Sequence, residues 1–393
     1  MMFTPTVVVA GARTPVGSYS GVLADVPAHQ LGATAVRGAT DRAGIQVDEV
    51  DEFVLGCVGQ VGPDAFNARR VALAAGARAG STAMNVNRLC GSGLQSIISA
   101  ALELQGGDAA IVVAGGNENM SRQPFLDFQA RDGYRLADHL LVDGTRSLVT
   151  DPWGQYPMGV TAERVADRFG VNRREQDEFA AESQRRAGAA LEAGLVDGEI
   201  VPVTVAGRKS ARVVADDEHP RPGTTVEKLA NLRAAFVNDG TVTAGNSSGI
   251  NDGAAAVVMT TTPVARDRGL PVLGELVAFS KVGVEPEIMG YAPTTAIGRV
   301  LQKSGLTLSD IGWIELNEAF AAQAVAVIRD AELDPALVNP LGGAIAWGHP
   351  IGATGAILTI RLLQNLRRTG KEHGLVTMCI GGGQALAAIF RVG

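Results

Sequence analysis

The sequence has few of the residues that build disulfide-rich, metal-held or membrane-spanning proteins. It contains 3 cysteines among 393 residues, and none belongs to a CxxC pair. Three cysteines cannot form a disulfide framework, and without a CxxC pair we expect no structural zinc site. No apolar run approaches the roughly 18–20 residues of a membrane helix, and the first residues lack the basic segment of a signal peptide. These absences predict a cytoplasmic protein without a membrane-bound part or a metal.

Aromatic residues and positive charge are also scarce. Aromatic residues make up 5% of the chain and the formal net charge is −7, so we expect no surface for nucleic acid. The hydrophobic residues must therefore be mainly Ala, Val, Leu and Ile, which is typical of sheets covered by helices. The length exceeds one ordinary domain core of ~100–200 residues. Composition thus predicts an α/β protein with two or three domains, or one doubled domain.

The chain contains a faint internal repeat. Residues 42–56 and 303–317 align at a shift of 261 positions, and each copy reads as a helix end, a glycine, a short linker and a strand. Each copy then has a glycine-rich turn that opens a helix, followed by a buried strand that ends in glycines. Any α/β protein repeats strands, glycines and helices, but three ordered matches favour a duplication.

The segment between the copies has a different character. Residues 121–157 are polar and rich in turn signals, and amphipathic helices are expected near 159–169 and 173–193. Asn172 and Glu175 have the spacing of a capping box at the start of the second helix. This pattern predicts an insertion that carries substrate contacts.

Two cysteines and one histidine stand on glycine-rich turns. Cys90 precedes apolar residues at helical spacing, so we expect it at a helix start, where N–H groups and the dipole would stabilise a thiolate. A buried structural cysteine is the alternative for Cys90.

His349 opens the corresponding helix of the second copy. Cys379 ends an apolar strand before three glycines, whose N–H groups could face an oxyanion. One sulfur could carry an acyl group while the other exchanges a proton with carbon. We expect the other four histidines to be solvated.

A competing motif lies at residues 245–249, where GNSSG fits the G-x-S-x-G pattern of a hydrolase nucleophile elbow. That elbow needs a strand before the serine and a helix directly after it, whereas residues 254–259 read as a strand. A serine hydrolase of acyl-CoA or other esters is the second hypothesis. A catalytically silent acyl-CoA-binding protein is the third.

Five motifs resemble those of the thiolase family, in the family's order and over essentially the whole chain. They are NRLCGSG around Cys90, AGNSSGINDGAAA at 244–256, NEAF at 317–320, GGAIAWGHPIGATGA at 342–356 and CIGGG at 379–383. The resemblance implies duplicated α/β halves in a five-layer α-β-α-β-α sandwich. The first half would comprise residues 1–120 and 249–271, and the second residues 272–393. Residues 121–248 would form an inserted α+β loop domain that binds coenzyme A.

The resemblance also implies an activity and residue roles. Cys90 would accept the acyl group, His349 would activate Cys90, and Cys379 would remove the α-proton of acetyl-CoA. Asn317 would fix a water beside His349 in one oxyanion hole, and the N–H groups of Cys90 and Gly381 would form the second. The implied coenzyme A contacts are Met158, Arg221, Phe236, Ala244, Ser248, Ala319 and Phe320. The implied enzyme is an acetyl-CoA C-acyltransferase without a permanent cofactor, with coenzyme A and acyl-CoA as substrates, and a homodimer or dimer of dimers.

Some positions depart from the pattern of biosynthetic acetoacetyl-CoA thiolases. Pro157 stands where these usually have histidine, and Asn339-Pro340-Leu341 replaces Asn-x-Asn. Both features resemble degradative 3-ketoacyl-CoA thiolases, whereas the long loop at 121–157 resembles the biosynthetic type. Trp347 replaces a smaller aliphatic residue, so the sequence does not determine the shape of the pocket wall beside His349. Acyl chain length and the direction of flux stay open as well.

Overall fold

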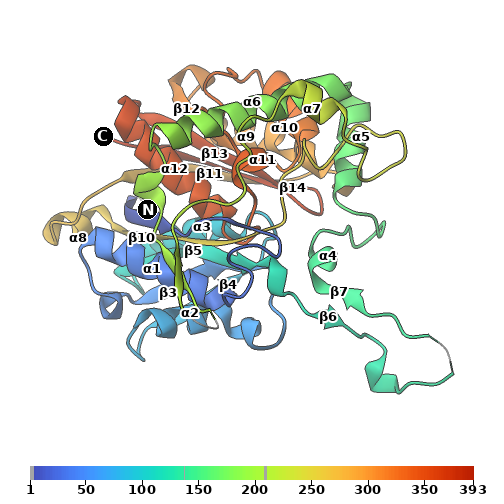
Figure 1. Cartoon of the computed structure of the whole chain (residues 1–393). Coiled ribbons are helices and arrows are strands. Elements are labelled where there is room, and N and C mark those ends of the chain that lie inside the picture. Colours follow the sequence, from blue (N-terminus) through green and yellow to red (C-terminus); the bar gives the residue numbers. More distant parts are fainter. Residues whose placement is uncertain (1–3, 137, 208–209) are drawn as a thin grey trace.

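One continuous sheet joins the two copies of the repeat. The computed structural model describes residues 4–136, 138–207 and 210–393. Within these residues a mixed sheet of ten strands has the order β12-β13-β14-β11-β1-β10-β5-β3-β4, with β2 beside β10. Helices lie between the two halves of this sheet and on both outer sides (Figure 1). No helix in this part of the chain is long and apolar enough to cross a membrane.

In the first half of the sheet, β3 pairs in parallel with β4 and β5, and β10 lies antiparallel between β5 and β1. The elements of this half are β1 (Thr6–Arg13), β2 (Gly17–Ser18), α1 (Ala28–Ala43), η1 (Val47–Glu49), β3 (Glu52–Gly56), η2 (Gly62–Phe66), α2 (Asn67–Ala75), β4 (Thr82–Val86), α3 (Ser92–Gly106), β5 (Ile111–Asn119), β10 (Asn251–Thr261) and α8 (Thr262–Asp267).

The second half repeats this arrangement. Here β12 pairs in parallel with β13, and β14 lies antiparallel between β13 and β11. A parallel bridge between Ile314 and Val338 takes the place of β4. The elements of this half are β11 (Gly274–Gly283), η6 (Pro286–Tyr291), α9 (Ala292–Ser304), η7 (Leu308–Asp310), β12 (Ile311–Leu316), α10 (Ala321–Asp330), α11 (Ala344–Trp347), α12 (Thr354–Thr369), β13 (His373–Ile380) and β14 (Gln384–Arg391). The predicted duplication is therefore confirmed.

The aligned residues of the repeat have the same local structure. Gly44 ends α1 with a φ of 71°, and Gly305 ends α9 with a φ of 72°. Glycine adopts this left-handed conformation without the steric cost that a Cβ atom brings. A 3-10 turn with a capping box follows each glycine and leads into β3 or β12.

Three hydrophobic clusters separate five layers. One cluster packs α1 and α2 on the outer face of the first half, and another packs α9 and α10 on the outer face of the second. The third surrounds α3 and α12, which contact each other between the halves. A Cβ atom at Gly355 would lie 2.2 Å from Leu94 N, so glycine allows the close approach of these two helices. The predicted five-layer sandwich is confirmed.

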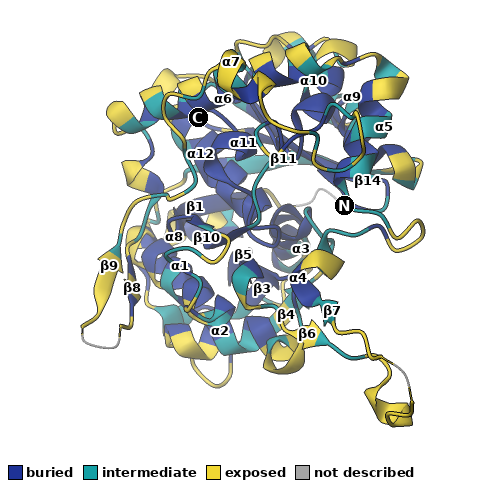
Figure 2. Ribbon diagram, turned by 45° about the vertical axis from the view of Figure 1, so that its right-hand side comes forward, coloured by how far each residue is buried: buried dark blue, intermediate teal, exposed yellow. Residues whose placement is uncertain are grey.

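The segment between β5 and β10 holds the inserted elements. They are η3 (Met120–Arg122), β6 (Phe125–Leu126), η4 (Ala130–Asp132), β7 (Val142–Asp143), α4 (Gly144–Leu148), α5 (Gly159–Phe169), α6 (Arg173–Glu192), η5 (Asp197–Glu199), β8 (Val203–Val205), β9 (Arg212–Val214) and α7 (Val226–Ala230). Both predicted helices are present, and the capping box of Asn172 and Glu175 opens α6. The β6–β7 pair extends away from the body of the molecule (Figures 1 and 2). The exact domain boundaries stay a prediction.

Candidate active site

A cavity of about 160 Å³ lies where loops of both halves and of the insertion meet. Cys90, His349 and Gly381 line it together. They come from the loop before α3, the loop before α12 and the turn after β13. The rest of the lining is mainly apolar and comprises Leu89, Met120, Leu148, Val149, Pro157, Met158, Gly159, Phe236, Ser247, Ser248, Gly249, Ile250, Met289, Ala319, Phe320 and Ile351. The structure thus brings residues from distant parts of the chain to one site.

The loop that carries Cys90 has a constrained backbone. Leu89 has a φ of 46°, which is uncommon for a residue with a side chain. Ser92 holds this loop, because its Oγ accepts a hydrogen bond from Arg88 N at 2.9 Å and donates one to Leu89 O at 2.7 Å. Helix α3 begins only at Ser92, with Gly91 as its N-cap. Cys90 therefore precedes the helix and is not its first residue.

The surroundings of Cys90 differ from the sequence prediction. Burial raises the pKa of the Cys90 thiol to about 11, although the N–H groups of Gly381 and of Cys90 itself interact with the sulfur and lower the pKa. The predicted helix-start thiolate is therefore wrong for the protein without substrate. The sulfur is a thiol at neutral pH and needs a base that removes its proton.

His349 has the properties of such a base. It lies five residues before the start of α12, in a loop and not at the helix start that the sequence predicted. Its backbone N–H donates to Asn251 Oδ1 at 2.8 Å, and its Nδ1 lies 2.7 Å from Thr354 Oγ1. Its Nε2 is buried and has no hydrogen-bond partner among the described residues. Burial lowers the pKa of His349 to about 4, so the imidazole is neutral and able to accept a proton.

Cys379 is the second-to-last residue of β13 and is fully buried. Its Sγ donates to Gln323 Oε1 at 3.5 Å. Burial raises the pKa of Cys379 above its usual range, and negative charge on Cys90 raises it further. The two sulfurs therefore influence each other, although only Cys90 lines the cavity.

Asn317 follows β12 and is also fully buried. Its backbone N–H donates to Thr377 O at 3.0 Å. Neither Oδ1 nor Nδ2 of its side chain has a partner among the described residues. Buried amide groups are normally hydrogen-bonded, so this side chain is suited to hold a water or a substrate oxygen.

Five of the seven expected coenzyme A contacts line the cavity: Met158, Phe236, Ser248, Ala319 and Phe320. The rings of Phe236 and Phe320 meet edge to face, with centroids 6.0 Å apart. Arg221 and Ala244 are exposed and do not line the cavity. The backbone N–H of Arg221 donates to Gln184 Oε1 at 2.9 Å, which fixes the backbone and leaves the guanidinium at the surface.

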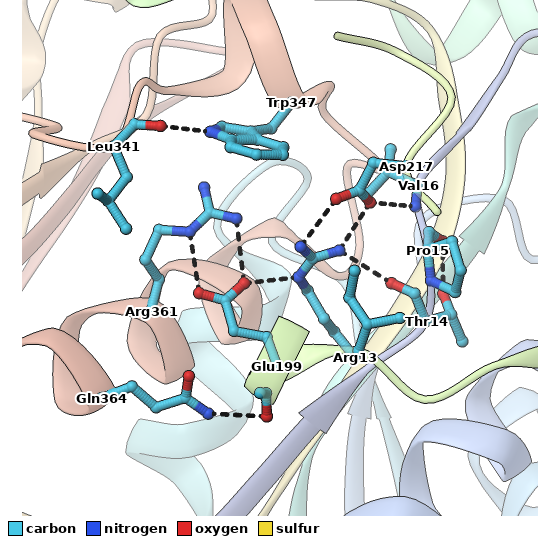
Figure 3. A network of polar contacts seen from close by, with 12 residues as sticks. Arg13, Thr14, Pro15, Val16, Glu199, Asp217, Leu341, Trp347, Arg361 and Gln364 are labelled. Carbon is cyan, nitrogen blue, oxygen red and sulfur yellow. Dashed lines mark hydrogen bonds and ion pairs between the residues drawn. The ribbon is translucent and has the colours of Figure 1, made fainter. Parts of the chain in front are cut away.

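Trp347 does not form the cavity wall. Its Nε1 donates to Leu341 O at 2.8 Å, and the guanidinium of Arg361 lies 4.7 Å from its ring centroid (Figure 3). The large side chain therefore packs against Leu341 and Arg361, outside the lining of the cavity.

A buried ion network lies beside Trp347 (Figure 3). Glu199 of the insertion pairs with Arg13 of β1 at 2.7 Å and with Arg361 of α12 at 3.1 Å. Arg13 also pairs with Asp217 at 2.7 Å. All four side chains are at most 1% exposed. The network joins the insertion to both halves of the molecule, and the sequence pattern did not indicate it.

His219 contradicts the expectation of a solvated histidine. It is half-buried, and its Nδ1 lies 3.3 Å from Asn251 Nδ2. The same Asn251 accepts the backbone N–H of His349, so His219 supports the active-site loop through one intermediate residue.

Glu118 is a further site-forming residue that the sequence analysis missed. It is fully buried and accepts hydrogen bonds from the N–H groups of Val58, Gly59 and Gly352, each at 3.0 Å. Burial raises the pKa of Glu118 to about 7. This carboxyl group joins the loop after β3 to the loop after His349. An acidic residue at the end of an apolar strand was the available signal.

The hydrolase alternative fails on geometry. Ser247 lies in a loop, and its Oγ donates to Thr243 O at 2.7 Å. The next regular element is the strand β10, whereas a nucleophile elbow requires a helix.

Comparisons with known proteins agree with this geometry. The model of the thiolase N-terminal domain matches residues 6–262, and that of the thiolase C-terminal domain matches residues 270–392. The beta-ketothiolase BktB of Cupriavidus necator is 48% identical over 391 residues, which cover 99% of both chains. An acetyl-CoA acetyltransferase of Pseudomonas aeruginosa is 46% identical and covers 97% of this chain and 98% of its own.

Solved structures are similar over the whole chain as well. The acetyl-CoA acetyltransferase of Bacillus anthracis superposes with a TM-score of 0.97 at 41% identity, over 99% of both chains. The human mitochondrial 3-ketoacyl-CoA thiolase has a TM-score of 0.97 at 39% identity, over 100% of both chains. On these grounds the chain belongs to the thiolase family and is an acyltransferase enzyme.

Proposed function

We propose that the protein transfers an acyl group between acetyl-CoA and an acyl-CoA by reversible Claisen condensation and thiolysis, through a thioester on Cys90. The observation that carries this proposal is the meeting of Cys90, His349 and the N–H group of Gly381 at one cavity. A neutral base and a thiol next to two N–H donors are the groups that acyl transfer to sulfur requires.

In the first step, His349 takes the proton of Cys90 and the sulfur attacks the thioester carbonyl carbon. The electron pair of the carbonyl moves to oxygen, where the N–H groups of Cys90 and Gly381 stabilise the charge. The carbon–sulfur bond to coenzyme A then breaks, and His349 returns the proton to the departing thiolate. The acyl group is left on Cys90.

In the second step of condensation, Cys379 in its thiolate form removes an α-proton from acetyl-CoA. The enolate oxygen is stabilised by a water held on Asn317. The enolate carbon attacks the Cys90 thioester, the carbon–sulfur bond breaks, and Cys90 leaves as a thiolate. Thiolysis follows the same steps in reverse.

Coenzyme A is proposed as a substrate and not as a permanently bound group. The apolar lining around Phe236 and Phe320 suits its pantetheine arm, and Ser248 supplies a polar group. A human 3-ketoacyl-CoA thiolase in complex with CoA, with a TM-score of 0.96 and 39% identity, supports this proposal. Arg221 and Ala244 are proposed to contact the nucleotide end from outside the cavity.

The acyl substrate is proposed to be short or of medium length. The similar proteins include both acetyl-CoA acetyltransferases and 3-ketoacyl-CoA thiolases, and Pro157 lines the cavity as a small, apolar residue. A role in fatty acid metabolism and a cytoplasmic location fit this chemistry and the three free cysteines.

We also propose a homodimer or a dimer of dimers. The strand β4 forms an edge of the sheet and is only partly covered, and exposed strand edges in proteins are usually protected by pairing. Near the extended β6–β7 pair, Phe125 is 65% and Phe128 is 75% exposed. A second copy of the chain would cover such apolar side chains. Sedimentation showing a stable monomer at micromolar concentration would contradict this proposal.

The test of the proposed activity is a mass spectrum of the protein after mixing with acetyl-CoA. We expect one acetyl group, located on the peptide that contains Cys90. Cys90→Ser should remove it and reduce thiolysis to below about a tenth of wild type, because an alkoxide forms far less readily than a thiolate. The third cysteine, Cys57, is buried but does not line the cavity, so Cys57→Ser is the matched control and should keep the adduct. Acetyl on Ser247, or no adduct in the wild type, would overturn the proposal.

A further inference from the structure

Gln323 contacts the second cysteine of the site. It lies in the first turn of α10 and is fully buried. Its Oε1 accepts the backbone N–H of Ala319 at 3.2 Å and lies 3.5 Å from Cys379 Sγ. Its Nε2 is buried and has no partner among the described residues. Neither the motifs nor the expected roles had included this residue.

The contact with Ala319 determines which end of the amide faces the sulfur. A backbone N–H can only donate a hydrogen bond, so the group that it meets must be the carbonyl oxygen of Gln323. The same oxygen faces Cys379. Because an amide oxygen can only accept, the sulfur must supply the proton.

We propose that Gln323 is a positioning residue that holds Cys379 as a thiol, so that the enzyme without substrate keeps this sulfur as the proton donor and not as the base. The inference rests on the proposed function and adds a protonation state to it. Burial of the sulfur raises the pKa of Cys379 as well, and so favours the same thiol form.

The two directions of the reaction then start from different states of Cys379. In thiolysis, Cys90 attacks the 3-keto carbon and the carbon–carbon bond breaks, which leaves the enolate of acetyl-CoA. The enolate carbon takes the proton of Cys379, and the electron pair of the S–H bond stays on sulfur. In condensation, Cys379 must lose this proton to solvent before it can act as the base. Exchange of the acetyl methyl protons should therefore rise with pH.

Few charged groups can disturb this arrangement. Among the described groups, Cys90 is the one whose charge acts on Cys379. Several titratable side chains on the elements around Cys379 are engaged elsewhere. Glu163 accepts a hydrogen bond from Thr241, Arg164 pairs with Glu287, and Arg329 pairs with Asp330. Trp313 donates to Glu315, and His349 lies beside Thr354. Cys379 belongs to an apolar cluster whose other members come mainly from α5, η6 and α10.

The experiment follows the exchange of acetyl-CoA methyl protons with deuterated solvent across pH. Gln323→Met removes the acceptor at similar volume, so the profile should move to lower pH by about one unit, which is about tenfold in rate on its rising limb. Gln323→Glu places a carboxylate beside the sulfur, so the profile should move to higher pH. Gln323→Asn has a shorter side chain, so the amide oxygen no longer reaches the sulfur, and the pH profile should move in the same direction as in Gln323→Met. The two variants keep the test valid if one of them does not fold. Gln176→Met changes a buried glutamine outside the cavity lining and should leave the midpoint unchanged.

Acetylation of Cys90 is read in the same samples by mass spectrometry. If the wild type is not acetylated, the proposed function fails. The role of Gln323 is supported if Cys90 is acetylated, Gln323→Met and Gln323→Asn shift the midpoint to lower pH, and Gln323→Glu shifts it to higher pH. Coincident midpoints, shifts in one common direction, or slower exchange without a shift would overturn the role of Gln323 alone.

Discussion

The hydroxyl group of Thr354 determines which nitrogen of His349 carries the proton. Thr354 Oγ1 lies 2.7 Å from His349 Nδ1 and 3.0 Å from the carbonyl oxygen of Pro350. The carbonyl can only accept, so it takes the single hydroxyl proton, and Nδ1–H donates to Oγ1. The lone pair is then on Nε2, the nitrogen that has no protein partner among the described residues.

Thr354→Val should slow the acetylation of Cys90 about 10- to 100-fold, with a smaller effect on KM. Valine keeps the shape of threonine but no longer holds the imidazole in the tautomer that accepts a proton at Nε2. Stopped mixing with acetyl-CoA followed by mass spectrometry measures the rate. Thr354→Ser keeps the hydroxyl and should remain close to wild type. An equal loss in both variants would mean that the methyl group, and not the hydroxyl, matters.

Cys379→Ser should separate acyl transfer from carbon–carbon bond formation. Acyl transfer to Cys90 needs no removal of an α-proton, so the variant should still accumulate the thioester. The serine hydroxyl has too high a pKa to act as the base, so exchange of the acetyl methyl protons should be lost. Exchange at the wild-type rate would remove Cys379 from the mechanism and leave His349 as the base.

Alkylation of Cys90 by iodoacetamide should accelerate continuously from pH 6 to pH 9. The pKa of its thiol is raised to about 11, so the thiolate fraction grows about tenfold for each pH unit in this range. Peptide mapping locates the label, and Cys90→Ser provides the blank. A plateau near pH 7 would show that a preformed thiolate–imidazolium pair exists, contrary to the neutral state of both groups.

Glu199→Gln should destabilise the protein strongly. It leaves Arg13 paired with Asp217 but deprives Arg361 of the carboxylate that it contacts. Loss of one partner from a buried ion pair costs about 3–5 kcal/mol. Urea unfolding at constant protein concentration measures the change. Glu182→Gln removes a carboxylate that is 41% exposed and should cost less than about 1 kcal/mol. Similar losses in both variants would mean that the buried network contributes no more than a surface pair.

Local features of this protein were readable in the sequence because they depend on neighbouring residues. The ends of α1 and α9 at glycines, the capping box of Asn172 and Glu175, and the strand β10 follow from backbone conformation and short-range hydrogen bonds. The duplicated halves were visible because corresponding local signals recur in the same order. The motifs around Cys90 and Cys379 pointed to the family for the same reason, since each is a short continuous segment.

Long-range contacts and burial were decided only by the tertiary structure. The pKa of Cys90 is raised because the packed loops exclude water from its sulfur, which outweighs the nearby N–H groups that sequence position suggested. Glu118 and Gln323 contact residues that only the fold brings close, and no local pattern distinguishes Gln323 from other buried polar side chains. The pairing of Arg13 with Glu199 joins residues 186 positions apart. Sequence thus determined the elements and the candidate reactive residues, whereas the protonation and support of those residues depend on distances and burial that exist only in the folded chain.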